Sequence, residues 1–293
     1  MIAYNPKDWF TFIFRFHKAD TFRKLLPLII GICVYSFLIA FLEMEYFKLA
    51  ETSHVKNIPI MHGMLGFVIS LLLVFRTNTA YDRWWEGRKL WGALVNNSRN
   101  LAIKIAAILS VSDNEHRAFF RNAIPAFAFA LQKHLRSELP NHETEDGLNS
   151  IFQHVSKDRH VPNQIAALMT KRVHELVSQG KITKEEWIIL NNELVAFTDI
   201  CGACERIKNT PIPFSYSIFL KKFIFFYVMT LPFGYVFSLG YYVIPVVAFI
   251  FYVLASLELV AEEIEEPFGG DENDLPTEQI SQNIQIHVGE ILG

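Results

Sequence analysis

Three long stretches of this chain carry no charged residue, and they constrain the fold more than any other feature. They comprise residues 25–42, 57–75 and 223–257. A helix crosses the hydrocarbon core of a bilayer in about 20 residues, so each of the first two stretches fits one span. The third is too long for a single span, and Gly240 lies near its middle as a turn residue. We therefore predict four membrane spans, with the last two folded back at residues 238–242.

The composition indicates a membrane protein that also has a large part in water. Of the 293 residues, 51% are hydrophobic and 26 are Phe, whereas soluble domains are about 45–50% apolar. Yet 19% of the residues are charged, which is too many for a chain lying wholly in lipid. The formal net charge of -3 leaves no basic excess to neutralise phosphates, so no nucleic-acid partner is expected.

Lysine and arginine gather at particular ends of the spans. Basic residues precede the first span, follow the second as Arg76, Arg83, Arg88 and Lys89, and precede the third as Arg206, Lys208, Lys221 and Lys222. The loop between the first two spans has Lys48 and Lys56 against three glutamates. Because cytoplasmic loops carry the excess of Lys and Arg, both termini and the long central segment are predicted to be cytoplasmic.

The expected organisation follows from these spans and from helical periodicity in the middle of the chain. Apolar residues recur there at three- and four-residue spacing, with breaks at 137–147, 159–163 and 178–183 and no convincing strand pattern. We predict an N-terminal segment at 1–24, two spans at 25–92 of which the second continues into the cytosol, a cytosolic helical domain at 93–216, spans three and four at 217–260, and a cytosolic C-terminal segment at 261–293. The stretch WFTFIFRFHK (9–18) fits either a helix lying on the membrane or one packed on the cytosolic domain.

The second span has a bulky apolar stripe and a charge at its end. Phe67, Leu71 and Phe75 fall at i, i+4 and i+8, which places them on one helix face. If several copies surrounded an axis, the stripe would form apolar rings that gate ions by expelling water; alternatively, it faces lipid. Arg76 follows directly, so its charge must reach the headgroups or find a partner.

Motifs for catalysis are missing from the sequence. The chain lacks H-E-x-x-H, Gly-rich phosphate loops and G-x-S-x-G, and its ten His are scattered without ligand spacing. Cys201 and Cys204 form a lone C-x-x-C without a second pair, for which we expect an ordinary helical role. We therefore expect no enzyme activity and no cofactor.

Three separated motifs give the chain a family resemblance. They are FRTNTAYDRWWEGRKLWG (75–92), GACERIKNTPIPFSYS (202–217) and EEIEEPFGGDENDLP (262–276), and they occur in the order found in bestrophins. The chain is identified as a member of the bacterial branch of that family. The resemblance implies an all-α polytopic membrane protein with four transmembrane helices and a large cytosolic helical domain. It also implies a homopentameric ion channel in the bacterial inner membrane, in which the second-span helix lines the pore.

The resemblance also implies three sites. The family's hydrophobic neck falls on Phe67, Leu71 and Phe75. Its cytosolic aperture falls at or near Glu185, with Lys184 or Glu186 as alternatives. The calcium-binding loop of animal members matches Asp271, Glu272 and Asp274, but Gly270 and Asn273 replace acids there, so calcium control is doubtful.

The selectivity of such a channel stays open at the sequence level. A ring of Glu185 carboxylates would attract cations, and on that ground we favour a monovalent cation such as sodium; the alternative is chloride or another anion, as in animal bestrophins. A hypothesis from another class is a membrane-anchored scaffold or sensor. A carrier with helices broken at Pro232 and Pro245 is a lesser alternative, because no inverted repeat accompanies them.

Overall fold

The computed structural model describes residues 21–47, 58–138 and 148–293, and all regular structure in these ranges is helical. The stretch 9–18, for which a membrane-surface helix was one expectation, lies outside them. The described chain forms two compact units. The membrane unit contains the described residues up to Arg83 together with Pro211–Glu266, and the helical unit contains Trp84–Thr210 and Pro267–Gly293.

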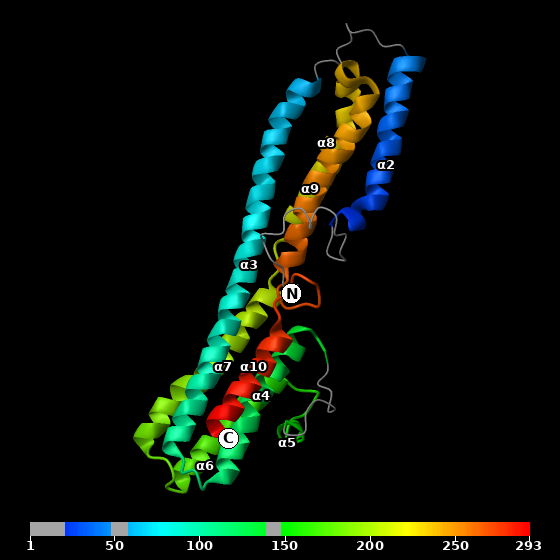
Figure 1. Cartoon of the computed structure of the whole chain (residues 1–293). Helices are drawn as coiled ribbons and strands as arrows, with labels where there is room; N and C mark the ends of the chain where they lie inside the picture. Colours follow the sequence, from blue (N-terminus) through cyan, green and yellow to red (C-terminus); the bar gives the residue numbers. More distant parts are fainter. Residues whose placement is uncertain (1–20, 48–57, 139–147) are drawn as a thin grey trace. The chain divides into compact units, whose positions relative to one another are not determined.

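Three apolar helices of the membrane unit lie side by side in Figure 1. They are α2 (Thr21–Phe41), α8 (Phe214–Leu239) and α9 (Val243–Glu265), and one π-helical turn, η1 (Leu42–Tyr46), extends α2. A short 3-10 turn, η3 (Gly240–Tyr242), separates α8 from α9. Gly240 has φ +54°, a left-handed conformation that favours glycine. The predicted reversal at residues 238–242 is therefore confirmed.

The described residues contain three helical stretches that are long and apolar enough to cross a membrane. They are Thr21–Tyr46, Ile58–Ile108 and Phe214–Glu265, and the last of these contains the reversal at Gly240. Multiple membrane crossings are thus supported, and the division of the third stretch into two spans stays a prediction.

One helix, α3 (Ile58–Ile108), runs without interruption for 51 residues. Its only proline is Pro59, in the first turn, where the missing backbone N–H has no intrahelical partner in any case. The prediction that the second-span helix continues past Arg76 into the charged FRTNTAYDRWWEGRKLWG segment is confirmed. Its residues up to Arg83 belong to the membrane unit, and those from Trp84 onward belong to the helical unit.

The apolar core of the membrane unit draws on all four of its helices. Ile32 of α2, Ile69 and Leu73 of α3, Val228 of α8 and Val247 of α9 are buried in one cluster. The four helices are therefore held together mainly by burial of aliphatic side chains.

The helical unit combines the rest of α3 with α4 (Asn114–Leu135), α5 (Asn149–Phe152), α6 (Val161–Ser178), α7 (Lys184–Asn209) and α10 (Thr277–Leu292). The C-terminal helix α10, red in Figure 1, lies beside α4. Trp91, Phe120, Phe127, Phe197 and Phe268 are fully buried in its core. The gap between the end of α6 at Ser178 and the start of α7 at Lys184 confirms the predicted break at 178–183. The break predicted at 159–163 is confirmed only in part, because α6 already begins at Val161, and most of the break predicted at 137–147 lies outside the described residues.

Candidate ion-conduction site

The predicted neck residues lie on a face of α3 that nothing else in the described chain covers. Phe67 is 71% exposed, Leu71 is 46% exposed and Phe75 is 56% exposed. Four further apolar side chains on the same side of the helix are also exposed, namely Ile60, Met64, Val68 and Val74. This uncovered face, defined by these seven residues, is apolar over about four helical turns.

The opposite face of α3 is packed and hydrogen-bonded. Ile69 and Leu73 are buried, and the ring of His62 lies within hydrogen-bond distance of Ile58 O (3.0 Å from Nδ1) and Thr230 Oγ1 (2.9 Å from Nε2). Tyr216 Oη of α8 donates to Leu72 O at 2.9 Å. These contacts fix the rotation of α3 in the membrane unit, so the uncovered face has a defined direction.

Arg76 finds a protein partner rather than the headgroups. It is 1% exposed, its Nη2 lies 2.7 Å from Glu265 Oε2, and its Nε lies 3.4 Å from Glu258 Oε2. Glu265 also accepts hydrogen bonds from Ile212 N (2.7 Å, at Oε1) and, through its backbone oxygen, from Arg83 Nε (3.1 Å). The positive charge at the end of the apolar segment is thus neutralised inside the unit.

Two more acidic residues of α9 pair with bases on other helices. Lys221 of α8 lies 2.8 Å from Glu262, and Lys24 of α2 pairs with Glu263. Together with Arg76 and Glu265, these pairs tie α9 to each of the three other helices in the unit. The glutamates that precede the acidic loop therefore act as structural partners of basic residues.

Glu185 lies in the first turn of α7, and its side chain is exposed. The neighbouring Glu186 is committed to a capping box: its Oε2 accepts from Thr183 N at 2.8 Å, and its own N–H donates to Thr183 Oγ1 at 3.1 Å. Lys184 is also exposed. Glu185 and Lys184 thus have exposed side chains while Glu186 caps the helix, and which of the three lines the aperture stays a prediction.

The predicted calcium loop is braced by one of its own acids. Asp274 is buried, and its Oδ2 accepts a hydrogen bond from Asp271 N at 2.5 Å. Asn273 O accepts from Trp84 Nε1 at 3.1 Å, and Leu275 N donates to Pro267 O at 2.9 Å. The Asp274 carboxylate thus holds the loop shape, and the use of Asp271, Glu272 and Asp274 as calcium ligands stays a prediction.

The described residues bring together one group of three side chains with metal-ligand chemistry, His134, His160 and Glu205. The Nε2 atoms of both histidines lie 2.6 Å from Glu205 Oε1. His160 Nδ1 accepts a hydrogen bond from Asn163 N at 3.1 Å and so caps α6. A neutral His160 therefore carries its proton on Nε2 and donates it to Glu205, so a metal ion there would have to displace that proton. We interpret the group as a hydrogen-bonded brace between α4, α6 and α7.

The two histidines of this brace affect the pKa of Glu205, and Glu205 in turn affects a nearby cysteine. Burial raises the pKa of Glu205, but the hydrogen bonds from His160 and His134 outweigh it, so the pKa lies below the ordinary glutamate value. Cys201, one turn before Glu205, and Cys204, directly before it, are buried free thiols. Burial, with the nearby Glu205 carboxylate, raises the pKa of Cys201 to about 12. Both cysteines are therefore neutral packing residues of α7, as the sequence led us to expect.

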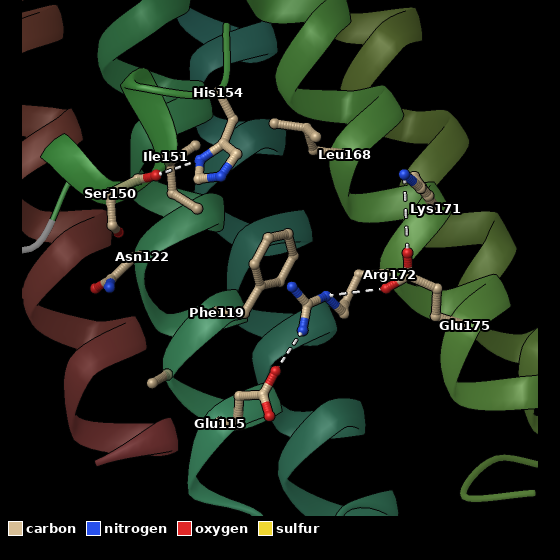
Figure 2. Close-up of a pocket in the computed structure, with 11 residues that line it drawn as sticks. Glu115, Phe119, Asn122, Ser150, Ile151, His154, Leu168, Lys171, Arg172 and Glu175 are labelled. Atoms are coloured by element: carbon tan, nitrogen blue, oxygen red, sulfur yellow. Dashed lines mark hydrogen bonds and ion pairs between the residues drawn. The ribbon is translucent and has the colours of Figure 1, made fainter. Parts of the chain in front are cut away.

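A cavity of about 360 Å³ in the helical unit, lined by both apolar and charged side chains, is shown in Figure 2. Arg172 lies across it, with Nη1 3.2 Å from Glu115 Oε1, Nε 3.4 Å from Glu175 Oε2, and the guanidinium carbon 4.4 Å from the centre of the Phe119 ring. His154 also lines the cavity, and its Nδ1 lies within hydrogen-bond distance of Ser150 O, at 2.7 Å. Because Arg172 is already matched by two carboxylates and a ring face, this cavity has no unbalanced charge from that arginine to attract an ion.

Several helices with long uncharged apolar stretches, and a long helix with an uncovered apolar face, define a multi-pass helical membrane protein. The family model for the bacterial/fungal bestrophin protein matches residues 1–290. The chain therefore belongs to the bestrophin family.

Individual relatives cover most or all of the chain. A voltage-dependent anion channel-forming protein of Nostoc sp. is 38% identical over 244 residues, which is 80% of each chain. The voltage-dependent anion channel-forming protein YneE of Escherichia coli is 32% identical over 292 residues, covering 98% of this chain and 92% of YneE. The crystal structure of a bacterial bestrophin homologue from Klebsiella pneumoniae matches with a TM-score of 0.80 and 26% identity, covering 92% of this chain and 98% of that one.

These comparisons confirm the resemblance carried by the three motifs. The chain is a bestrophin-family ion channel and not an enzyme, because the members of this family are ion channels. The scaffold hypothesis is thereby set aside.

Proposed function

We propose that this chain assembles as a pentamer in the bacterial inner membrane and passes small monovalent ions passively along the uncovered face of α3. The observation that carries the proposal is the contrast between the two faces of this helix. One face is fixed by His62, Leu73 and Arg76, while Phe67, Leu71 and Phe75 have no cover within the described chain. A symmetric ring of copies would turn that face toward a common axis.

In this assembly the neck gates ions by dewetting. Phe67, Leu71 and Phe75 would each contribute one apolar ring, and a narrow apolar bore expels water, so an ion cannot pass without losing its hydration. The rings carry no charge and cannot distinguish anions from cations. Selectivity must therefore come from charged groups elsewhere along the pathway.

The proposed topology follows the distribution of basic residues. Four spans, both termini in the cytoplasm, and a cytosolic domain over 93–216 agree with the excess of Lys and Arg at the span ends. The N-terminal segment 1–24, the span regions 25–92 and 217–260 and the C-terminal segment 261–293 complete this arrangement. We do not propose calcium control through Asp271, Glu272 and Asp274, because Gly270 and Asn273 take the place of acids in this loop and calcium needs six to eight oxygen ligands.

We propose anions as the conducted species, contrary to the preference for sodium drawn from the sequence. The support is the naming of relatives up to 38% identical as voltage-dependent anion channel-forming proteins. One observation favours the second candidate, a cation channel: Glu185 has an exposed carboxylate at the start of α7, where the family resemblance puts the aperture. Five such carboxylates around a pore would attract cations.

The first test is the reversal potential of the purified full-length chain in planar bilayers under a sodium chloride gradient. An anion channel reverses near the chloride equilibrium potential, and Glu185→Ala leaves that value in place. Glu278→Ala is the matched control, because Glu278 is likewise an exposed glutamate in the first turn of a helix, α10. Reversal near the sodium potential that collapses in Glu185→Ala alone would establish the cation channel instead.

The second test addresses the neck. Phe67→Ala combined with Phe75→Ala widens two of the three rings, so we expect larger ion flux in liposomes than for the wild type. Phe226→Ala combined with Phe249→Ala is the control, because both are exposed phenylalanines on α8 and α9 rather than on α3. Unchanged flux in the α3 variant, or an equal rise in the control, would contradict the neck assignment. No current from correctly assembled wild type would contradict conduction itself.

A further inference from the structure

A largely apolar cavity of about 530 Å³ lies between α2, α8 and α9 of the membrane unit. Its walls include Leu28 and Ile32 of α2, Ile224 and Phe225 of α8, and Phe251 and Leu259 of α9. Sites for small molecules occupy about 300–1,000 Å³ and combine apolar walls with a few polar groups. The size and lining of this cavity match that description.

The charged groups of the cavity gather at one end. Lys221 is the first lining residue of α8, and Glu258 and Glu262 lie at the end of the lining part of α9. Residues 223–257 carry no charge, so this charged end begins where the apolar run of α9 ends. A molecule in the cavity would therefore have its apolar part along the helices and its polar part at the level expected for lipid headgroups.

Glu258 is the group in the cavity whose hydrogen bonding is incomplete. It is 4% exposed, and neither carboxylate oxygen accepts a hydrogen bond from any described residue. Its nearest cation, Arg76, lies 3.4 Å away through Nε and is itself engaged at 2.7 Å with Glu265. A buried carboxylate oxygen without a donor is costly, so this site calls for an additional N–H or O–H donor.

The other two charged residues of the cavity, Lys221 and Glu262, carry opposite charges. Lys221 and Glu262 form a 2.8 Å pair, and both side chains are about half exposed. The cavity end thus offers two carboxylates and one ammonium group. A ligand with a primary ammonium and a phosphate would supply the donor that Glu258 lacks, and could exchange partners with the half-exposed pair of Lys221 and Glu262.

We propose that this cavity binds a phospholipid with a primary ammonium headgroup, of the phosphatidylethanolamine type. The ammonium donates hydrogen bonds to Glu258 and Glu262, the phosphate lies near Lys221, and one acyl chain fills the space between α2, α8 and α9. A trimethylammonium headgroup has no N–H to donate, and an anionic glycerol headgroup would add negative charge beside two carboxylates. The proposal depends on the membrane location of these helices and not on which ion is conducted.

Gly31 gives a way to block the apolar part without touching the charged end. It lines the cavity, and a Cβ at this position would meet no atom within 4 Å. Gly31→Leu therefore adds bulk into the cavity rather than into a packed contact. Gly63→Leu on α3 is the matched control, because a Cβ there also meets nothing within 4 Å and Gly63 does not line the cavity.

The test is lipid binding to the full-length protein, measured by native mass spectrometry after delipidation. The probes are dioleoyl phosphatidylethanolamine, phosphatidylcholine and phosphatidylglycerol, added separately. We expect the wild type to bind the ethanolamine lipid about tenfold more tightly than the other two, as one or two charge-assisted hydrogen bonds allow. Glu258→Gln and Glu262→Gln should reduce that preference, Gly31→Leu should weaken binding, and Gly63→Leu should leave both as in the wild type.

Three results would overturn the proposal. Equal affinity for the three lipids would show that no headgroup is recognised. Full ethanolamine-lipid binding by Gly31→Leu would place the lipid elsewhere, and absence of lipid from the assembled protein would mean that another subunit fills the cavity. Because Glu258 is buried beside Arg76, Glu258→Gln can fail to fold; Glu262→Gln and Gly31→Leu then decide the question, since neither removes a partner of Arg76.

Discussion

At the scale of single residues, the membrane unit depends on a buried charge network around Arg76. A buried arginine loses its hydration, and its two carboxylate partners must replace it. Arg76 meets Glu265 closely and Glu258 less closely. A network of this kind gives less stability than its short contacts suggest, but removal of one member leaves the others as uncompensated buried charges.

Arg76→Ala should therefore be strongly destabilising, by about 3–5 kcal/mol, because it leaves Glu258 and Glu265 without their cation. The measurement is denaturant or thermal unfolding of the full chain in detergent. Arg88→Ala is the control, since Arg88 lies on the same helix with an exposed side chain, and such surface changes stay within about 0.5 kcal/mol. Equal stability of the two variants would mean that the Arg76 pairs contribute nothing.

Glu205 supplies a pH-dependent contribution to the helical unit. Because its pKa is lowered in the folded chain, its contribution is present above the ordinary glutamate value of 4.5 and is lost as the pH falls below it. Glu205→Gln should thus lower the melting temperature at pH 7, and the difference from the wild type should shrink below pH 4.5. Thermal unfolding at both pH values, with Glu278→Gln as an exposed control, measures this. A difference that grows at acidic pH would contradict the brace formed with His134 and His160.

At the scale of helices, the periodicity and composition of the sequence predicted where the helices lie, but not which side chains pair between them. The apolar stretches, the reversal near Gly240 and the continuity of α3 could all be predicted, because each depends on residues close together in sequence. The partners of Arg76 and the group of His134, His160 and Glu205 could not, because they join residues far apart in the chain.

Trp91 shows the same limit in another form. Its setting among charged residues after an apolar span is typical of a membrane interface, where a tryptophan ring is half wet. It is fully buried in the core of the helical unit instead. The local sequence therefore predicted that Trp91 lies on a helix, but not that other helices of the unit bury its side chain.

Close approach of α8 to the start of α3 depends on Gly234. A Cβ there would lie 2.6 Å from Pro59 Cδ and 3.0 Å from Ile58 Cβ, which are parts of short, stiff side chains. Gly234→Ala should destabilise the full chain by about 1–3 kcal/mol through overpacking. Gly63→Ala, where the new Cβ meets nothing within 4 Å, should instead be neutral or gain about 0.5–1 kcal/mol in helix propensity. Thermal unfolding in detergent compares them, and equal melting temperatures would contradict the close contact.

At the scale of the whole molecule, the uncovered face of α3 is where the proposed assembly of several copies would form. An apolar face of this size on a helix that is otherwise packed marks either lipid contact or association. In the proposed channel, this face of each copy faces the pore. The proposal can therefore be tested by counting the copies of the chain in the purified assembly.

We expect five copies in the purified assembly, measured by native mass spectrometry in detergent. The Phe67→Ala, Phe75→Ala variant should retain the same number, because the neck residues line the proposed bore and do not carry the packed contacts of α3. Its increased flux would then reflect a wider neck rather than dissociation. A different number of copies in the wild type would contradict the pentamer while leaving the family assignment intact.

The acidic end of α9 also has a consequence for biosynthesis. Lys24, Arg76 and Lys221 are made and inserted before the glutamates with which they pair, since Glu258, Glu262, Glu263 and Glu265 all come later in the chain. In the proposed topology, the three earlier helices would hold their positive charges at the cytoplasmic surface until α9 is made. The acidic residues of α9 then supply the partners of all three, so we expect these ion pairs to complete the bundle last.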